Sequence, residues 1–242
     1  MELLFSQSVQ VSQADVNAAG ELKLSVLLHY DQEAAGGHCQ KLGLDWETMQ
    51  KKGLFWAVLR HRAQIQRLPK AGETITVETW PLPTTRSAFP RAVRALDAEG
   101  KVLFDVMSLW VLMDPNTRAM ILPGKSGVDV PGIQRPDQAD IPGSIPPGQF
   151  QNAALWHISP EDLDRNGHVN NARYLDQAEQ LSPAGNSAKG FTVCYLSEAL
   201  PGEEISMTWE QNFEGILQVD GRRIKTDVSG GTERVFALRV EY

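Results

Sequence analysis

Residues 72–80 read Gly72-Glu73-Thr74-Ile75-Thr76-Val77-Glu78-Thr79-Trp80, a stretch with the period-two patterning of a half-buried β-strand. Its opening recurs much later in the chain as Gly202-Glu203-Glu204-Ile205. Three ordered matches of this kind indicate an internal duplication of one structural unit. The two other pairs of matching segments are Tyr30–Glu33 with Tyr174–Gln177, and Ser108–Val111 with Ala237–Val240.

A segment rich in proline and glycine, residues 123–150, separates the two copies. It contains six prolines and five glycines, and such a composition argues against a regular helix or a central strand. We therefore interpret it as a linker between an N-terminal half, residues 1–122, and a C-terminal half, residues 151–242. The length of 242 residues leaves room for two small domains.

Each half shows the same predicted order of elements: a short strand, a loop, one helix and a run of strands. The patterns predict strands over residues 5–11 and 154–158 and a helix over residues 25–42. A second helix is predicted to begin near Asn170, a good N-cap residue, and to end before Pro183. Because glycine is costly inside a helix, the Gly36-Gly37 pair indicates a close approach to a sheet.

The strands after each helix complete an α+β architecture in which an antiparallel sheet wraps one helix. In residues 55–65 the alternation predicts Phe55, Ala57, Leu59, Ala63 and Ile65 on one face. The remaining predicted strands cover residues 75–80, 91–96, 102–113, 205–209 and 236–240.

The composition, 42% hydrophobic and 22% charged, is that of an ordinary globular protein. A net charge of -7 argues against a general nucleic-acid binder, because phosphate contacts need a basic surface. No apolar run approaches the roughly 20 residues of a membrane span, and no basic region of a secretory signal precedes the first apolar residues. The only cysteines, Cys39 and Cys194, do not suggest a disulfide framework. These features predict a cytoplasmic protein.

Basic residues nevertheless gather locally, for example at Arg60, Arg62 and Arg67. Docking depends on local patches rather than on total charge, so an acidic protein partner is compatible with the composition. The simpler interpretation is a solvated strand face, and the sequence by itself favours it.

The segment with the most chemistry is Asp164-Arg165-Asn166-Gly167-His168-Val169-Asn170-Asn171-Ala172-Arg173-Tyr174. If its backbone is extended, the alternating Asp164, Asn166 and His168 place a carboxylate, an amide and an imidazole on one side. These groups can hold a water and polarise a carbonyl, and a following helix N-terminus favours an oxyanion. Asp and Asn also cap helices and form turns, so this spacing is compatible with catalysis or with loop structure.

The same segment resembles the active-site motif of the acyl-acyl carrier protein thioesterases of plastids and some bacteria. The shared residues are Asp-x-Asn-x-His-Val-Asn-Asn followed by x-x-Tyr, and Gly-His-Val-Asn-Asn segments occur in single-hotdog acyl-CoA thioesterases. Trp110-Val111-Leu112-Met113-Asp114-x-x-Thr117-Arg118 resembles that family's Trp-Val-Met-Met-Asn-x-x-Thr-Arg, and residues 72–80 resemble their counterpart. The resemblance covers most of the chain outside the linker. It implies a tandem (double) hotdog fold, with two antiparallel sheets each wrapped on one long helix.

The resemblance implies a catalytic set of Asp164, Asn166, His168 and Glu198. The glutamate lies in Tyr195-Leu196-Ser197-Glu198-Ala199, which matches a strand of the family in which plant members have Cys after Glu. Ala199 stands in the place of that Cys, so a thiol nucleophile is excluded there. We interpret Cys39 and Cys194 as core residues.

The implied reaction is hydrolysis of fatty acyl-acyl carrier protein to free fatty acid and carrier protein in fatty acid biosynthesis. In this interpretation Asp164 or Glu198 activates a water, or Asp164 attacks directly to give a transient anhydride. His168 and Asn166 then stabilise the oxyanion and the leaving thiolate. Neither the motif nor its spacing distinguishes these routes.

Two further carboxylates, Asp176 and Glu179, lie in the second predicted helix, where some hotdog thioesterases carry their acid. We interpret both as structural. The N-terminal half lacks the motif before its helix and is expected to supply the acyl pocket, with Leu28, Ala35 and His38 as candidate lining residues.

Two other functions fit the same fold: hydrolysis of acyl-CoA, and binding of acyl thioesters without catalysis. No metal is expected, because the histidines show no ligand spacing, and no cofactor is expected, because no phosphate-binding loop occurs. The expected partner is acyl carrier protein with its fatty acyl chain. The sequence does not decide the acyl chain length or saturation, or whether the protein forms a homodimer.

Overall fold

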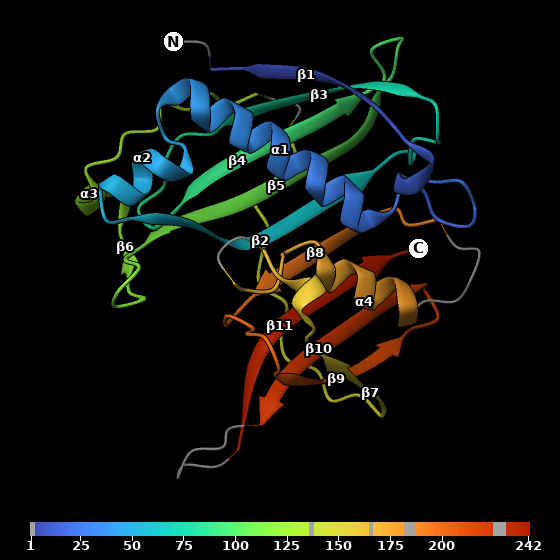
Figure 1. The fold of residues 1–242 in the computed structure, drawn as a ribbon. Coiled ribbons are helices and arrows are strands. Elements are labelled where there is room, and N and C mark those ends of the chain that lie inside the picture. The colour runs from blue at the N-terminus through green and yellow to red at the C-terminus, as the bar shows by residue number, and fades with distance from the viewer. Residues whose placement is uncertain (1–2, 136–137, 165–166, 182–186, 225–230) are drawn as a thin grey trace. The chain divides into compact units, whose positions relative to one another are not determined.

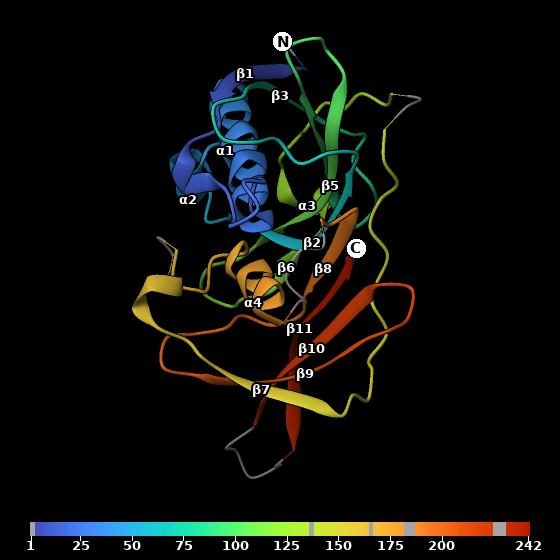
Figure 2. The ribbon, with the colours of Figure 1, turned by 90° about the vertical axis from the view of Figure 1, so that its right-hand side faces the viewer.

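The computed structural model describes residues 3–135, 138–164, 167–181, 187–224 and 231–242. The chain divides into two compact units, Met1–Pro142 and Gly143–Tyr242. This division falls inside the predicted linker. In each unit one helix lies across the face of an antiparallel sheet (Figures 1 and 2).

The N-terminal unit has the strand order β1-β3-β4-β5-β2, with every neighbouring pair antiparallel. A short strand, β6, pairs with β5. Its elements are β1 (Phe5–Gln10), the 3-10 helix η1 (Gln13–Asp15), α1 (Leu24–Leu42), α2 (Trp46–Lys51), β2 (Phe55–Ile65), β3 (Thr74–Pro81), β4 (Phe89–Leu96), β5 (Val102–Met113), β6 (Met120–Ile121) and α3 (Pro123–Ser126).

The C-terminal unit has the order β8-β11-β10-β9-β7, which is the same topology with β7 in the place of β1 and β8 in the place of β2. Its elements are β7 (Asn152–His157), the 3-10 helix η2 (Pro160–Asp162), α4 (Arg173–Leu181), β8 (Gly190–Tyr195), β9 (Glu204–Gln211), β10 (Ile216–Ile224) and β11 (Thr232–Glu241).

The turn before β3 is repeated before β9. The N–H of Gly72 donates to the carbonyl of Val11 at 2.8 Å, and the N–H of Gly202 donates to the carbonyl of Ile158 at 3.1 Å. Both glycines have a positive φ, which only glycine adopts without cost. The first strand of each unit, β1 or β7, also leads into a 3-10 helix with the same Ser-x-x-Asp capping box. The backbone therefore carries the duplication that the sequence predicts.

Helix α1 forms where the apolar spacing predicts it, and its Leu24, Leu27, Leu28 and Ala34 are buried. The predicted close approach at Gly37 is also present. A Cβ placed on this glycine would lie 2.9 Å from the ring of Phe5 in β1. The helix ends at Gly43, whose left-handed conformation is typical of a helix C-terminus.

The alternation predicted for residues 55–65 is wrong before Arg60. The pairing of β2 with β5 shifts register between Val58 and Arg60, so Leu59 is the extra residue of a β-bulge. A bulge changes which side chains face the helix. Val58 is therefore buried together with His61, Ala63 and Ile65, whereas Leu59 is only partly buried.

The described parts of segment 123–150, residues 123–135 and 138–150, contain a short helix and tertiary contacts that the composition did not predict. The segment begins with the one-turn helix α3, which forms because Pro123 takes the first helical position, where a missing N–H costs nothing. Further along, Ile133 donates its N–H to the carbonyl of Pro81 at 2.9 Å and packs beside Trp80. Gly132 passes so close to Leu82 that a Cβ would lie 2.1 Å from its carbonyl carbon.

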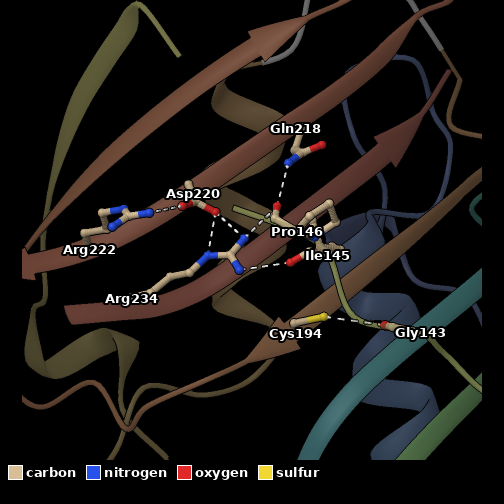
Figure 3. Close-up of polar contacts among 8 residues, drawn as sticks. All are labelled: Gly143, Ile145, Pro146, Cys194, Gln218, Asp220, Arg222 and Arg234. Atoms are coloured by element: carbon tan, nitrogen blue, oxygen red, sulfur yellow. Dashed lines mark hydrogen bonds and ion pairs between the residues drawn. The ribbon is translucent and has the colours of Figure 1, made fainter. Parts of the chain in front are cut away.

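The last part of the segment is bound to the C-terminal sheet (Figure 3). Arg234 donates to the carbonyls of Ile145 and Pro146 at 2.9 and 3.0 Å, and its Nε donates to Asp220 at 2.7 Å. Ile145 packs on the side chains of Cys194 and Ala237. Arg234 reaches Asp220 because a register shift between β10 and β11 turns both side chains to one face. Residues 143–146 thus contact the sheet throughout their length.

The opposite face of this sheet packs against α4 through aromatic rings. The ring of Phe236 contacts Tyr174 with 4.9 Å between ring centroids, and Trp156 lies 5.3 Å from Tyr174. Gly221, the neighbour of Phe236 across β10 and β11, leaves the space that the ring fills. A Cβ on Gly221 would lie 2.0 Å from Cε1 of Phe236.

Replacement of Gly221 by Ala should therefore destabilise the protein. Extra volume in a packed core typically costs about 1–3 kcal/mol in the free energy of unfolding, and urea denaturation would measure it. Gly36→Ala is the matched control. Gly36 is exposed in α1 with no atom near its missing Cβ, so this substitution should leave stability unchanged or raise it by up to about 1 kcal/mol. Equal stability of both variants would contradict the packing at Gly221.

Candidate active site

Backbone hydrogen bonds join Asp164 to Gly167 and His168, so the prediction of an extended backbone between Asp164 and His168 is wrong. The N–H of Asp164 donates to the carbonyl of His168 at 2.8 Å, and the N–H of His168 donates to Oδ1 of Asp164 at 3.2 Å. Gly167 has a φ of +76°. A glycine that accepts positive φ and an Asp that binds nearby backbone N–H groups both favour turns. Asn166, the third predicted member, lies outside the described residues.

Helix α4 begins at Arg173, three residues later than predicted. Oδ1 of Asn170 accepts the N–H of Ala172 at 3.0 Å, and its carbonyl accepts the N–H of Arg173 at 2.9 Å. Asn170 therefore organises a turn before the helix instead of capping it directly. The helix ends at Leu181, whereas Pro183 lies outside the described residues.

Glu198 lies beside His168. It follows the end of β8 in the irregular segment 196–203, where the N–H of Val169 donates to the carbonyl of Ala199 at 3.1 Å. Oε2 of Glu198 lies 3.6 Å from Nε2 of His168, and the two side chains are 42% and 17% exposed. This separation exceeds a direct hydrogen bond and suits two groups that share a water. The turn and the segment thus bring Asp164, His168 and Glu198 into one place.

Asp176, the alternative acid in α4, has a structural partner. Its Oδ2 accepts a hydrogen bond from Nη1 of Arg173 at 2.9 Å. The same guanidinium donates to the carbonyl of Glu161 at 3.0 Å and lies 3.9 Å from Asp162. This network joins the first turn of α4 to η2, which agrees with a structural role for Asp176.

Two further residues belong to the same region: Arg223, which the sequence did not single out, and Tyr174, the last residue of the motif. Arg223, near the end of β10, donates to Oγ of Ser197 at 2.6 Å, to the carbonyl of Glu198 at 2.5 Å and to Glu203 at 2.6 Å. Burial raises the pKa of Tyr174, and Glu203 and Asp164 raise it further while Arg223 opposes them. The Tyr174 hydroxyl therefore stays protonated near neutral pH.

The surroundings of Ala199 and the cysteines agree with the absence of a thiol mechanism. Ala199 is buried, and its carbonyl is occupied by Val169. Cys194 is buried beneath Ile145, and Cys39 packs at the edge of a core cluster. Burial raises the pKa of the Cys39 thiol, although Arg91 lowers it in part, so the thiolate is disfavoured.

The candidate lining residues of the acyl pocket are two apolar side chains and one polar side chain in the interior of the N-terminal unit. Leu28, Ala35 and His38 are all buried on α1. Nδ1 of His38 lies 3.1 Å from Nη1 of the buried Arg91. The acyl-binding role of this half, like the catalytic role of the other, stays a prediction.

In the described part of the chain, no group of three His, Cys, Asp or Glu side chains could hold a metal ion. Within the same residues, no helix is long and apolar enough to cross a membrane.

Two helix-wrapped sheets of identical strand order define a tandem hotdog protein. Residues 2–122 match the family model described as the acyl-ACP thioesterase N-terminal domain. The chain therefore belongs to the acyl-ACP thioesterase family, and the resemblance inferred from the motifs is confirmed.

Several similar proteins are plant chloroplast enzymes. The palmitoyl-acyl carrier protein thioesterase of Gossypium hirsutum chloroplasts is 28% identical over 196 residues, which cover 75% of this chain and 48% of that protein. The oleoyl-acyl carrier protein thioesterase 2 of Arabidopsis thaliana is 28% identical over 166 residues, 60% of this chain and 44% of that one. The chain thus spans about half the length of the curated relatives it matches.

Solved structures confirm the predicted fold. An acyl-ACP thioesterase from Bacteroides thetaiotaomicron superposes with a TM-score of 0.87 and 25% identity, over 98% of this chain and 97% of that one. The 12:0-ACP thioesterase from Umbellularia californica superposes with a TM-score of 0.80 and 21% identity, over 100% and 97% of the two chains. The tandem hotdog assignment therefore holds for the whole chain.

Proposed function

We propose that this protein hydrolyses fatty acyl-ACP to free fatty acid and carrier protein, as a step of fatty acid biosynthesis. The observation that carries the proposal is the placement of Glu198 3.6 Å from His168, in a chain that belongs to the acyl-ACP thioesterase family. The named relatives from Gossypium hirsutum and Bacteroides thetaiotaomicron are themselves acyl-ACP thioesterases.

In the proposed reaction one water beside the pair is hydrogen-bonded to both Oε2 of Glu198 and Nε2 of His168. Glu198 takes a proton from the water as its oxygen attacks the thioester carbonyl carbon. His168 and Asn166 stabilise the oxyanion that forms. The C–S bond then breaks, and the proton on Glu198 passes to the leaving sulfur. Free acid and carrier thiol are released, and Glu198 returns to its carboxylate form.

We assign the base to Glu198 rather than to Asp164. The carboxylate of Glu198 is 42% exposed and accessible to water. Asp164 uses Oδ1 to hold the N–H of His168, so its carboxylate already has a structural task. An attack by Asp164 on the substrate would compete with that hydrogen bond.

Alanine substitution of Asp164, Asn166, His168 or Glu198 should each lower kcat by about 100-fold or more, because all four support one transition state. The losses should be far from additive in double variants. Asp176→Ala is the control and should retain activity within about threefold. A fully active Glu198→Ala variant together with an inactive Asp176→Ala variant would show that the catalytic acid is Asp176 in α4 and not Glu198.

Asp164→Asn separates the two roles open to Asp164. An asparagine oxygen can still accept the N–H of His168, but an amide can act neither as base nor as nucleophile. If Glu198 is the base, Asp164→Asn should lower kcat by less than about tenfold while Asp164→Ala costs much more. Loss of all activity in Asp164→Asn, with the folded state intact by circular dichroism, would assign the chemistry to Asp164.

The substrate assignment is tested with a panel of acyl chains presented on carrier protein and on CoA. We expect release of free acid with a higher kcat/KM for acyl-ACP than for the same acyl group on CoA. Hydrolysis of acyl-CoA alone would identify an acyl-CoA thioesterase on this fold. Tight binding of both thioesters without hydrolysis would identify a non-catalytic binding protein.

A basic patch formed by Arg60, Arg62 and Arg67 is the proposed docking site for the acidic carrier protein. Arg60 and Arg62 lie on the same strand opposite Leu109 and Met107. Arg67 binds both carboxylate oxygens of Glu73, at 2.7 and 2.8 Å, which offsets its charge. Arg62 is therefore the residue of this patch whose substitution tests the docking site most directly.

Arg62→Glu should raise KM for acyl-ACP roughly threefold to tenfold with little change in kcat, because charge at an interface acts mainly on association. The KM of the unmodified protein should also rise with salt, which screens such contacts. Lys125→Glu, an equal charge change in α3, is the control and should have no effect. Identical KM values for both variants at low salt would exclude this patch.

The further assignments rest on the sequence and belong to the same proposal. We place the acyl pocket in the N-terminal half and the catalytic residues in the C-terminal half, and the protein in the cytoplasm. A homodimer stays an open prediction, which light scattering on the purified protein would decide.

A further inference from the structure

Arg223 lies on the face of β10 that is turned toward α4. Arg223, Gly221 and Val219 occupy every second position along the strand and therefore share one face. Phe236 packs against Gly221 on that face. Arg222, the neighbour of Arg223, points to the other face, where it binds Asp220 at 3.0 Å (Figure 3). The side chain of Arg223 is 17% exposed, so its hydrogen bonds form in a largely desolvated place.

Three hydrogen-bond acceptors of Arg223 belong to the segment that carries Glu198, and its Nε lies 3.6 Å from Oε2 of Glu233 in β11. Nη2 binds Oγ of Ser197 and the carbonyl of Glu198, and Nη1 binds Oε1 of Glu203. Oε2 of Glu203 in turn accepts the N–H of Leu200 at 3.0 Å. Arg223 and Glu203 thus close the segment from both ends, with Glu198 between them.

The equivalent turn of the N-terminal unit is held in a different way. Glu73 precedes β3 as Glu203 precedes β9, and it accepts the N–H of Lys70 at 2.7 Å. Its arginine, Arg67, lies just beyond β2 and is 45% exposed. In the C-terminal half the arginine is Arg223, which lies within strand β10. It binds the carbonyl of Glu198, the residue beside His168.

We propose that Arg223 is a positioning residue that holds Glu198 beside His168. The side chain of Glu198 is partly exposed, so its direction depends on the backbone that carries it. Arg223 fixes that backbone through the carbonyl of Glu198 itself. The planar guanidinium reaches three acceptors at once, which a lysine ammonium on a flexible stem does not reproduce. This inference rests on the proposed function, because it assigns Arg223 to the hydrolysis reaction.

The test compares Arg223→Gln and Arg223→Lys with the control Arg222→Gln in steady-state hydrolysis of acyl-ACP. Displacement of a reacting group by about 1 Å can cost roughly 100-fold in rate. We expect Arg223→Gln to lower kcat at least about tenfold with KM within about threefold, and Arg223→Lys to fall between it and the unmodified protein. Arg222→Gln should retain full activity. A kcat within about threefold for Arg223→Gln would overturn the proposal.

A double-variant cycle distinguishes positioning from general stabilisation. If Arg223 acts through Glu198, Arg223→Gln should add less than about threefold to the loss caused by Glu198→Gln, since the same contribution is not lost twice. A fully multiplicative loss would mean that Arg223 acts elsewhere and would overturn the proposal.

Hydrogen exchange provides a readout that does not need activity. Amides in residues 196–203 should exchange faster in Arg223→Gln than in Arg222→Gln, while those of β10 and β11 away from residue 223 stay protected. Unchanged exchange in residues 196–203 would overturn the proposal. If the unmodified protein hydrolyses no thioester, the proposed function is wrong, and the exchange result still decides whether Arg223 holds this segment.

Discussion

The ring of Phe236 occupies the space that the absent side chain of Gly221 leaves on the inner face of the C-terminal sheet, where a Cβ would approach it to 2.0 Å. Tyr174 packs on this ring and belongs to the first turn of α4. The contact thus sets the height of α4 above the sheet. Because the motif turn leads directly into α4, the same contact also sets where His168 lies. Because the core is tightly packed here, a change at this contact would displace the neighbouring elements instead of being absorbed locally.

The candidate site itself consists of irregular backbone held on this rigid base. The N–H of Val169 binds the carbonyl of Ala199, and this hydrogen bond joins the motif turn to the segment after β8. Asp164 closes the turn with its carboxylate, whereas Glu198 leaves its carboxylate facing His168. The two acids therefore have different surroundings. Asp164 binds the backbone N–H of His168, and the side chain of Glu198 is partly exposed to water.

The sequence predicted the elements whose periodicity is strong. Helix α1 and strand β5 were located within one residue, because long runs of regular spacing leave few alternatives. The bulge at Leu59 was missed, since an extra residue in one strand depends on its partner strand and not on local pattern. The turn at Asp164 was mistaken for extended chain, because alternating polar residues suit both conformations until the hydrogen bonds are known.

The prediction of the site residues was also limited by contacts between segments that are distant in the sequence. Glu198 could be placed only through the family resemblance, because the contact with His168 joins segments thirty residues apart in sequence. Arg223 has no motif around it, and two adjacent arginines at the end of a strand give no sign of which one faces the site. The structural duplication supplies the missing comparison. In both halves a glutamate before the third strand of the unit, β3 or β9, closes a turn with an arginine, as Glu73 does with Arg67 and Glu203 with Arg223. In the C-terminal half the arginine comes from β10, so the device that closes the turn also reaches the backbone of Glu198. The glutamate–arginine pair that closes the turn is common to both halves, and in the C-terminal half it also contacts the proposed catalytic residue Glu198.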